Sequence, residues 1–190
     1  MVAVHGRKPV AVLKVRDRAK SLEREQEALA SLERLAPHTF SAPRPMGHGV
    51  AGPWYWSAQE VVFRRPHRPV LEAAPAFFEE VSAALAGLLP ATGDGVPAHG
   101  DLTPWNLRRD HRGRVWLFDW EDWGLAPVDA DRAYFSACSR AVGGPPMPTD
   151  LAPGAVAHHR PVIETRRRNA SPGVTLPDQI LAAFDEVEGR

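Results

Sequence analysis

The chain has 190 residues, in which 23 Lys and Arg balance 23 Asp and Glu to a formal net charge of zero. Such a length can bury a sizeable core, as one domain or as two small lobes, and the neutral charge gives no support for a nucleic-acid or anionic-membrane partner. A single cysteine, Cys138, excludes an internal disulfide framework, and no apolar run approaches the length of a membrane span. Without a signal-peptide pattern at the N-terminus, we expect a cytoplasmic protein.

Two β-branched runs at the start of the chain, 2–5 and 10–16, flank a turn-like segment and predict a hairpin. Side chains alternate along a strand, so Lys14 shares a face with Val10 and Val12. Taken alone, Lys14 would be an edge lysine whose ammonium reaches water.

Residues 22–35 predict an amphipathic helix with Ser21 as its N-cap. Glu25 falls inside the apolar arc of this helix. A carboxylate on a core face needs a cation or must lie at the core's edge. Lys14 is the nearest candidate cation, so the sequence predicts a Lys14–Glu25 ion pair. A pair at the rim with no catalytic role is the alternative.

The middle of the chain alternates between loops and short elements. Residues 36–52 are predicted as a loop, and 54–63 as one or two strands. The basic cluster 64–68 lacks interleaved aromatic residues, so we interpret it as a solvated linker and not as a phosphate or RNA site. Pro75 begins an amphipathic helix that ends near Pro90.

The most informative stretch reads His-Gly-Asp-Leu-Thr-Pro-Trp-Asn from His99, then a polar turn, then Val-Trp-Leu-Phe-Asp-Trp-Glu-Asp up to Asp122. Its two short strands predict a hairpin in which Asn106 lies opposite Leu117, provided that Arg109 pairs with Arg114. Asn106 and Asp119 would then share a face, where an amide oxygen and a carboxylate form half of a magnesium site. Asp101 lies just upstream, close enough to orient an attacking hydroxyl.

Asp and Asn are also common in turns, so this spacing alone would mean little. Two features favour a functional site. Asp119 directly follows Trp116-Leu117-Phe118, where an uncompensated carboxylate would be costly. In addition, the His-Gly-Asp and Pro-Trp-Asn motifs and a hydrophobic strand ending in Asp form a compound pattern that chance rarely assembles.

The C-terminal third is less patterned. Residues 127–140 predict a helix with Tyr134, Phe135 and Cys138 inward, and 177–187 predict a closing helix. Residues 149–174 show little periodicity, and His158-His159 within them is a weak signal for metal binding.

The segment from His99 to Asp119 resembles the catalytic core of the aminoglycoside phosphotransferase and choline kinase-like family, relatives of the protein kinases. Residues 120–124 and 131–133 resemble the family's continuation. The resemblance implies an α+β, two-lobed protein kinase-like fold. Residues 1–63 would form a small antiparallel-sheet lobe that binds nucleotide, and residues 64–190 a mainly helical catalytic and substrate lobe.

The resemblance also implies an activity: transfer of the γ-phosphoryl group of ATP, or alternatively GTP, to a hydroxyl of a small aminoglycoside-, choline- or sugar-like acceptor. Asp101 would accept the hydroxyl proton, and Asn106 and Asp119 would hold Mg²⁺. Lys14, held by Glu25, would bind the α- and β-phosphates.

Further positions take supporting roles under the same resemblance. Backbone groups from Glu60 to Val62 would meet the adenine. His99 would brace the catalytic loop, and Asp131 would cap backbone N–H groups near a helix start.

Three alternatives stay open. The family normally begins with another strand pair and a glycine-rich loop, whereas nine residues with one glycine precede Val10 here. We therefore expect a chain truncated at its N-terminus, and an inactive relative that binds a nucleotide or a protein is the second hypothesis. A metal hydrolase using His99, Asp101, His111 and Asp119 is the third.

The acceptor pocket has two interpretations. Aromatic and acidic residues close to the motif could bind a cationic acceptor, or they could be core tryptophans and surface acids. These residues are Trp105, Trp120, Glu121, Asp122 and Trp123.

Overall fold

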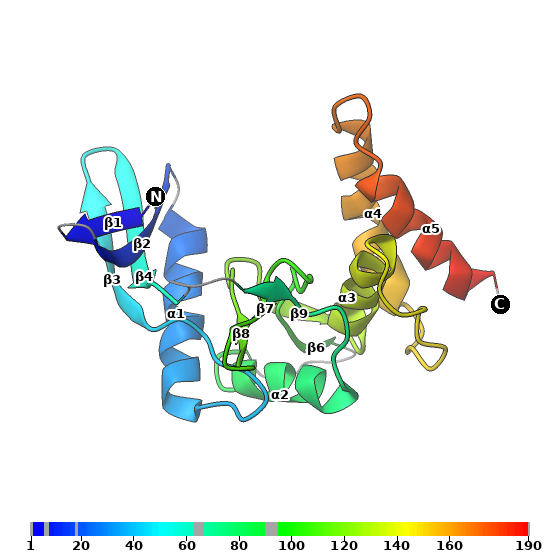
Figure 1. The fold of residues 1–190 in the computed structure, drawn as a ribbon, viewed down its shortest axis with the longest axis horizontal. Helices are drawn as coiled ribbons and strands as arrows, with labels where there is room; N and C mark the ends of the chain where they lie inside the picture. Colours follow the sequence, from blue (N-terminus) through cyan, green and yellow to red (C-terminus); the bar gives the residue numbers. More distant parts are fainter. Residues whose placement is uncertain (1, 6–7, 18, 63–66, 90–94, 190) are drawn as a thin grey trace.

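The computed structural model describes residues 2–5, 8–17, 19–62, 67–89 and 95–189. Its N-terminal part is an antiparallel four-stranded sheet in the order β1-β2-β4-β3, with helix α1 beside it (Figure 1). The elements are β1 (Val2–His5), β2 (Lys8–Arg16), α1 (Ala19–Leu35), β3 (Pro45–Ala51) and β4 (Trp54–Glu60).

Two details of this part differ from the sequence prediction. The helix begins at Ala19, so Ser21 lies within its first turn and is not the N-cap. Residues 45–51, predicted as loop, form β3 at the edge of the sheet. Proline and glycine disguise this strand in the sequence, and an edge position tolerates both because one side of the strand needs no ladder hydrogen bonds.

The middle of the chain holds short strands beside one helix. A three-stranded sheet has the order β5-β7-β8, and β6 pairs with β9. Pro75 occupies the first turn of the helix, as predicted. The elements are β5 (Arg68–Pro69), α2 (Pro75–Leu85), β6 (Gly95–Ala98), β7 (Leu107–Arg109), β8 (Val115–Leu117) and β9 (Gly124–Pro127).

The β7–β8 hairpin has a register one residue away from the predicted one. Arg109 lies opposite Val115, not Arg114, and Leu107 lies opposite Leu117. The cause is a three-residue loop in which the N–H of Asp110 donates to the carbonyl of Arg114 and Gly113 adopts a φ of 82°. A type I turn followed by a left-handed glycine is a common hairpin connection of this length.

Three helices, α3 (Ala130–Ala141), α4 (Ala155–Arg168) and α5 (Leu176–Glu188), pack together at the opposite end of the molecule from the four-stranded sheet (Figure 1). The sequence did not reveal α4. Its buried face is narrow, consisting of Ala155, Val156, His159 and Ile163, and Pro161 interrupts the pattern. The other turns are polar, so the apolar periodicity is weak.

The largest cluster of buried side chains includes residues of α1 as well as residues from the rest of the chain. Leu29 and Leu32 share it with Phe77, Leu102 and Trp120. The boundary between lobes at residue 63 lies in a segment outside the described residues and stays a prediction. The architecture is α+β with small antiparallel sheets, as predicted. None of the helices in the described part of the chain is both long and apolar enough to cross a bilayer.

Candidate active site

Lys14 lies at the meeting point of three carboxylates. Its Nζ is 2.7 Å from Oε1 of Glu25, 2.6 Å from Oδ1 of Asp119 and 2.9 Å from Oε1 of Glu121. Strand β2 supplies the lysine, α1 supplies Glu25, and the segment after β8 supplies the other two acids. The predicted ion pair between Lys14 and Glu25 is therefore present, and the whole cluster joins residues from three parts of the chain.

The charges in this cluster are strongly coupled. Burial alone would lower the pKa of Lys14, but Glu25 and Asp119 outweigh burial and raise it, so the ammonium stays charged. Burial raises the pKa of Glu25, with Lys14 opposing that effect. The side chain of Glu25 is 1% exposed, so its charge depends on the lysine beside it.

Glu121 is a member of this cluster that sequence reasoning did not place there. Its Oε1 also lies 3.1 Å from Nη2 of Arg16, the last residue of β2. The available signal was spacing, since Asp119 and Glu121 are two positions apart directly after a strand. That spacing alone does not tell which cation the second acid contacts.

Asp101 and Asn106 contact each other across one loop. The side-chain Nδ2 of Asn106 donates to the carbonyl of Asp101 at 2.9 Å and to its Oδ2 at 3.1 Å. The amide nitrogen is thus used within the loop. The amide oxygen, which is the metal-binding atom of asparagine, is left for another partner.

Asn106 and Asp119 do not converge in the way the sequence predicted. In the observed register the N–H of Phe118 donates to the carbonyl of Asn106 at 3.0 Å, so Asn106 faces Phe118 and not Leu117. Asp119 then adopts a φ of 67°, which ends the alternation of the strand. The prediction that strand alternation puts Asn106 and Asp119 on one face was therefore wrong. Asp119 nevertheless directly follows Phe118, the residue that lies opposite Asn106.

His99 is buried with both ring nitrogens engaged. Its Nδ1 accepts from the N–H of Asp101 at 3.3 Å, so Nε2 carries the proton and donates to the carbonyl of Phe118 at 3.0 Å. Burial lowers the pKa of His99, which fits a neutral ring. Since neither nitrogen is available to a metal, the hydrolase alternative that used His99 as a ligand is wrong. The ring instead braces the loop that carries Asp101.

Asp131 holds the same loop from the first turn of α3. Its Oδ2 accepts from the N–H of His99 at 2.6 Å and its Oδ1 from the N–H of Gly100 at 3.0 Å. The prediction that its carboxylate binds backbone N–H groups is confirmed, but these groups belong to the loop and not to its own helix. Burial raises the pKa of Asp131, with His99 opposing that effect.

Gly100 occupies a position that no side chain fits. Its φ is 85°, and a Cβ added there would lie 2.4 Å from the carbonyl oxygen of Asp122. The backbone of the loop that carries Asp101 therefore packs directly against the backbone of the segment after Asp119, with no side chain between them.

The residues predicted to meet the adenine are only partly available. The N–H of Glu60 donates to the carbonyl of Arg44 at 3.0 Å, and its Oε1 accepts from the N–H of Arg44 at 3.1 Å. The amide of Glu60 is therefore occupied within the sheet. Val61 and Val62 follow outside β4, and residues 63–66 lie outside the described part.

The tryptophans near the motif are mainly core residues. Trp120 is fully buried, and Trp123 is 6% exposed, with its indole N–H donating to the carbonyl of Arg24 at 2.8 Å. Only Trp105 of the three remains open to solvent, at 39%. Glu121 also binds Lys14, so of the five residues considered for a cationic acceptor only Trp105 and Asp122 remain exposed to solvent.

Arg166, near the end of α4, reaches the site from a helix that the sequence did not reveal. Its Nη1 lies 2.5 Å from the hydroxyl of Tyr134, and its Nη2 lies 3.5 Å from Oδ1 of Asp101. No sequence signal distinguished it from the two arginines that follow it.

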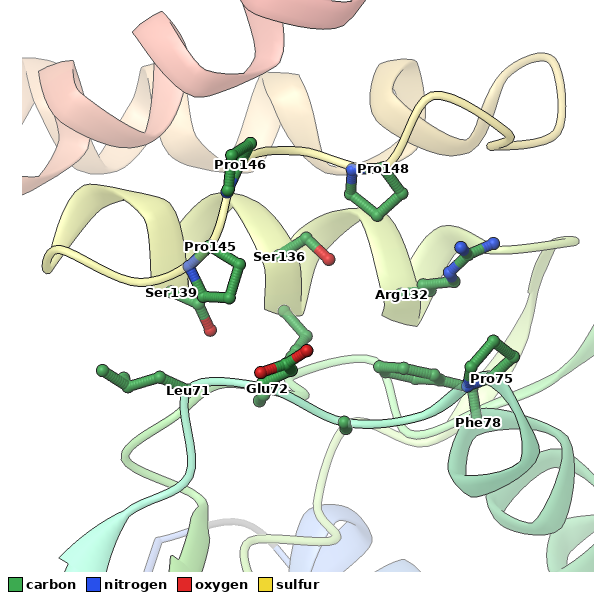
Figure 2. A pocket seen from close by; sticks show the side chains of 12 residues that line it. Leu71, Glu72, Pro75, Phe78, Arg132, Ser136, Ser139, Pro145, Pro146 and Pro148 are labelled. Atoms are coloured by element: carbon green, nitrogen blue, oxygen red, sulfur yellow. The ribbon is translucent and has the colours of Figure 1, made fainter.

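A separate small pocket of about 160 Å³ contains none of the predicted site residues. Figure 2 shows it between α3 and the segment that begins at Leu71, with the prolines Pro145, Pro146 and Pro148 along its upper side. The candidate active site is therefore the open cluster around Lys14 and Asp101, not this pocket.

Comparison with models of known protein families gives one match. The model of the phosphotransferase enzyme family (APH) matches residues 51–159, which is more than half of the sequence and includes Asp101, Asn106 and Asp119. The chain belongs to the phosphotransferase enzyme family. Lys14 and Glu25 precede the matched range.

Two solved structures are similar to this chain to different degrees. Amicoumacin kinase hAmiN, in complex with AMP-PNP, Ca²⁺ and Ami, has a TM-score of 0.50 and 13% identity over 95% of this chain and 76% of the kinase. WbdD has a TM-score of 0.43 and 15% identity over 95% of this chain and 42% of its own. No curated protein matches the sequence. The likeness to the first structure, together with the family match, establishes a kinase-like α+β fold.

Proposed function

We propose that this phosphotransferase-family protein transfers the γ-phosphoryl group of ATP to a hydroxyl of a small molecule. The observation that carries the proposal is the junction of Lys14 with Glu25 and Asp119, next to the loop in which Asn106 contacts Asp101. Phosphoryl transfer needs mainly positioning and electrostatic stabilisation, and this arrangement supplies a fixed cation and fixed oxygen ligands.

In the proposed reaction the acceptor oxygen bonds to the γ-phosphorus as the bond to the β-phosphate oxygen breaks, releasing ADP. Asp101 orients the hydroxyl and accepts its proton late in the step. Lys14 binds the α- and β-phosphates, and its ion pair with Glu25 keeps the ammonium in place. The neutral ring of His99 and the carboxylate of Asp131 keep the backbone around Asp101 fixed.

The donor set fits a hard divalent cation. The side chain of Asp119 is 45% exposed, and the hydrogen bonds of Asn106 with Asp101 use its Nδ2 and not its amide oxygen. We propose that Asp119 and the amide oxygen of Asn106 hold Mg²⁺, with water and phosphate oxygens as further ligands. Bound there, Mg²⁺ would neutralise charge on the phosphates.

The test is nucleotide-dependent phosphorylation of a panel of hydroxylated small molecules, run with ATP and with GTP. We expect phosphoryl transfer by the wild type and a loss of about 10²- to 10⁴-fold in kcat for Asp101→Ala, the range for removing a general base. Asp178→Ala, in an exposed residue of α5, is the matched control and should behave as the wild type. Activity that survives Asp101→Ala would refute the assigned base.

Calorimetry with AMP-PNP and Mg²⁺ separates this proposal from a nucleotide-binding module without activity. The inactive relative would be favoured if the wild type binds AMP-PNP, Lys14→Met does not, and the wild type transfers phosphate to no acceptor in the panel. Transfer to any panel member favours the enzyme.

A further inference from the structure

One cation, Arg166, lies beside the carboxylate oxygen of Asp101 that faces away from Asn106. Asp101 has two carboxylate oxygens with different partners: Oδ2 accepts from Asn106, and Oδ1 lies 3.5 Å from Nη2 of Arg166. An acceptor hydroxyl that hydrogen-bonds to Asp101 would therefore lie close to the guanidinium of Arg166. Its neighbouring atoms must be compatible with that cation.

Arg166 is held in place by Tyr134, and its contacts with described residues do not use all of its N–H donors. The hydroxyl of Tyr134 accepts from Nη1 at 2.5 Å, and the Tyr134 side chain is buried in the core of the three C-terminal helices. A guanidinium carries five N–H donors in a planar fork. The contacts with Tyr134 and Asp101 use two of them, and the side chain is 49% exposed. The remaining donors can bind a carboxylate or a phosphate in two-point fashion.

Of the acidic residues that follow the motif, Glu121 already has cationic partners, whereas Asp122 is exposed to solvent. Glu121 binds Lys14 and Arg16. Partial burial, followed by the charge of Asp101, raises the pKa of Asp122, but the residue is exposed, so its carboxylate is the one that competes with Arg166 for the acceptor. Trp120 and Trp123 lie in the core and offer no open aromatic face. An ammonium group beside Asp101 would therefore meet Arg166, and Trp105 is the one tryptophan of residues 99–123 that is open to solvent.

Building on the phosphoryl transfer proposed above, we propose that the acceptor carries an anionic group close to its reacting hydroxyl and that Arg166 binds this group. Carboxylate and phosphate share the chemistry that Arg166 recognises. When the anion binds the guanidinium, Oδ1 of Asp101 exchanges the long contact with Arg166 for the acceptor hydroxyl. Arg166 would then determine acceptor specificity, while Asp101 keeps its role with the proton.

The test uses four acceptors that share a three-carbon skeleton with a free hydroxyl and differ in charge. Glycerate and glycerol 3-phosphate are anionic, glycerol is neutral, and 3-amino-1,2-propanediol is cationic. The kcat/KM of each is measured with ATP and Mg²⁺, and its affinity is measured by calorimetry in the presence of AMP-PNP and Mg²⁺. Using both anions separates a carboxylate site from a phosphate site.

Arg166→Gln removes the charge, and Arg168→Gln is the matched control. Arg168 lies in the same turn, is exposed, and its Nη2 donates to Thr165, not to Asp101. We expect one of the anions to exceed glycerol by about tenfold or more in kcat/KM, the smallest effect expected for a hydrogen bond between charged groups. The ratio should fall to within about threefold in Arg166→Gln and stay unchanged in Arg168→Gln. Because it is taken within one variant, partial unfolding does not affect it.

The outcomes separate this inference from the function on which it rests. Transfer with equal or greater preference for the cationic acceptor, or an anion preference that survives Arg166→Gln, overturns the inference and leaves the phosphotransferase standing. No transfer to any acceptor, here or in the wider panel, refutes the proposed function. Absence of anion binding in the calorimetry then overturns the inference as well.

Discussion

Lys14 and Asp119, 105 positions apart in the sequence, are joined by an ion pair of 2.6 Å. This contact connects the N-terminal sheet to the segment that follows the β7–β8 hairpin, and Glu25 also contacts the lysine, at 2.7 Å. Of these two acids Glu25 is buried and Asp119 is 45% exposed, so loss of the lysine would leave an unpaired buried charge at Glu25.

Removing the lysine alone should be costly. Lys14→Met leaves Glu25 buried without a cation, and we expect the free energy of unfolding to fall by about 3–5 kcal/mol, measured by urea denaturation. The double variant Lys14→Met/Glu25→Leu should recover most of that loss and yet fail to bind AMP-PNP. As a control, Arg44→Met breaks the exposed pair with Glu60 and should cost less than about 1 kcal/mol. A double variant that binds AMP-PNP normally would contradict the role given to Lys14.

Gly100 and Gly113 have nearly equal φ angles, so their variants separate the cost of backbone strain from the cost of a steric clash. Gly113→Ala meets nothing within 4 Å at a φ of 82°, so it should cost about 1–2 kcal/mol from the left-handed conformation alone. Gly100→Ala has the same strain at a φ of 85° and also collides with the carbonyl of Asp122. We expect Gly100→Ala to lose more stability in urea denaturation and nearly all phosphoryl transfer. Equal losses for both variants would show that the close approach to Asp122 does not matter.

Asp131 should affect catalysis through the loop and not through the nucleotide. Asp131→Ala leaves the N–H groups of His99 and Gly100 without their acceptors, at a cost of about 1–3 kcal/mol for each unpaired group. We expect kcat to fall while the affinity for AMP-PNP stays close to that of the wild type. Asp150→Ala, which removes an exposed partner of Arg132, should leave both quantities unchanged. A selective loss of nucleotide affinity in Asp131→Ala would place this residue in a different role.

His159 should make the fold sensitive to acid. Burial, together with the charges of His158 and Arg166, lowers the pKa of His159 to about 3 from 6.5. The unfolded chain takes up this proton below pH 6.5 and the folded chain does not, so stability is complete above pH 6.5 and falls as the pH drops toward 3. The contribution is at most about 1.4 kcal/mol per pH unit.

The variant His159→Phe tests this contribution because it keeps a ring against Tyr134, on which His159 stacks with centroids 4.4 Å apart. Urea denaturation at several pH values should show a shallower acid loss in His159→Phe than in the wild type. His111→Gln, in the exposed hairpin loop, should keep the wild-type slope. An unchanged slope in His159→Phe would show that this histidine does not titrate as described.

Local patterns in the sequence were sufficient for several features. The helix from Ala19 was anticipated except for its first turn, because its leucines repeat at the helical period. The pairing of Glu25 with Lys14 followed from one charge on an apolar face. The order of His99, Asp101, Asn106 and Asp119 sufficed for the family, because it is a motif of residue types and spacing.

Contacts between residues far apart in the chain could not be predicted from such local patterns. The hairpin register depended on whether the loop had two or three residues, a difference set by Gly113. Helix α4 was hidden because its buried face is narrow and Pro161 interrupts it. Arg166 could be connected to Asp101 only once α4 was placed, and Asp131 could be connected to His99 only once α3 was placed.

The sequence by itself determined which chemical groups are present and where the strongest local periodicities lie, because these depend on near neighbours in the chain. The tertiary structure alone decided which of those groups meet: Glu121 with Lys14, Asp131 with the backbone of Gly100, and Arg166 with Asp101. Such contacts depend on the packing of whole helices and strands, and similar short charge patterns would be compatible with many partners.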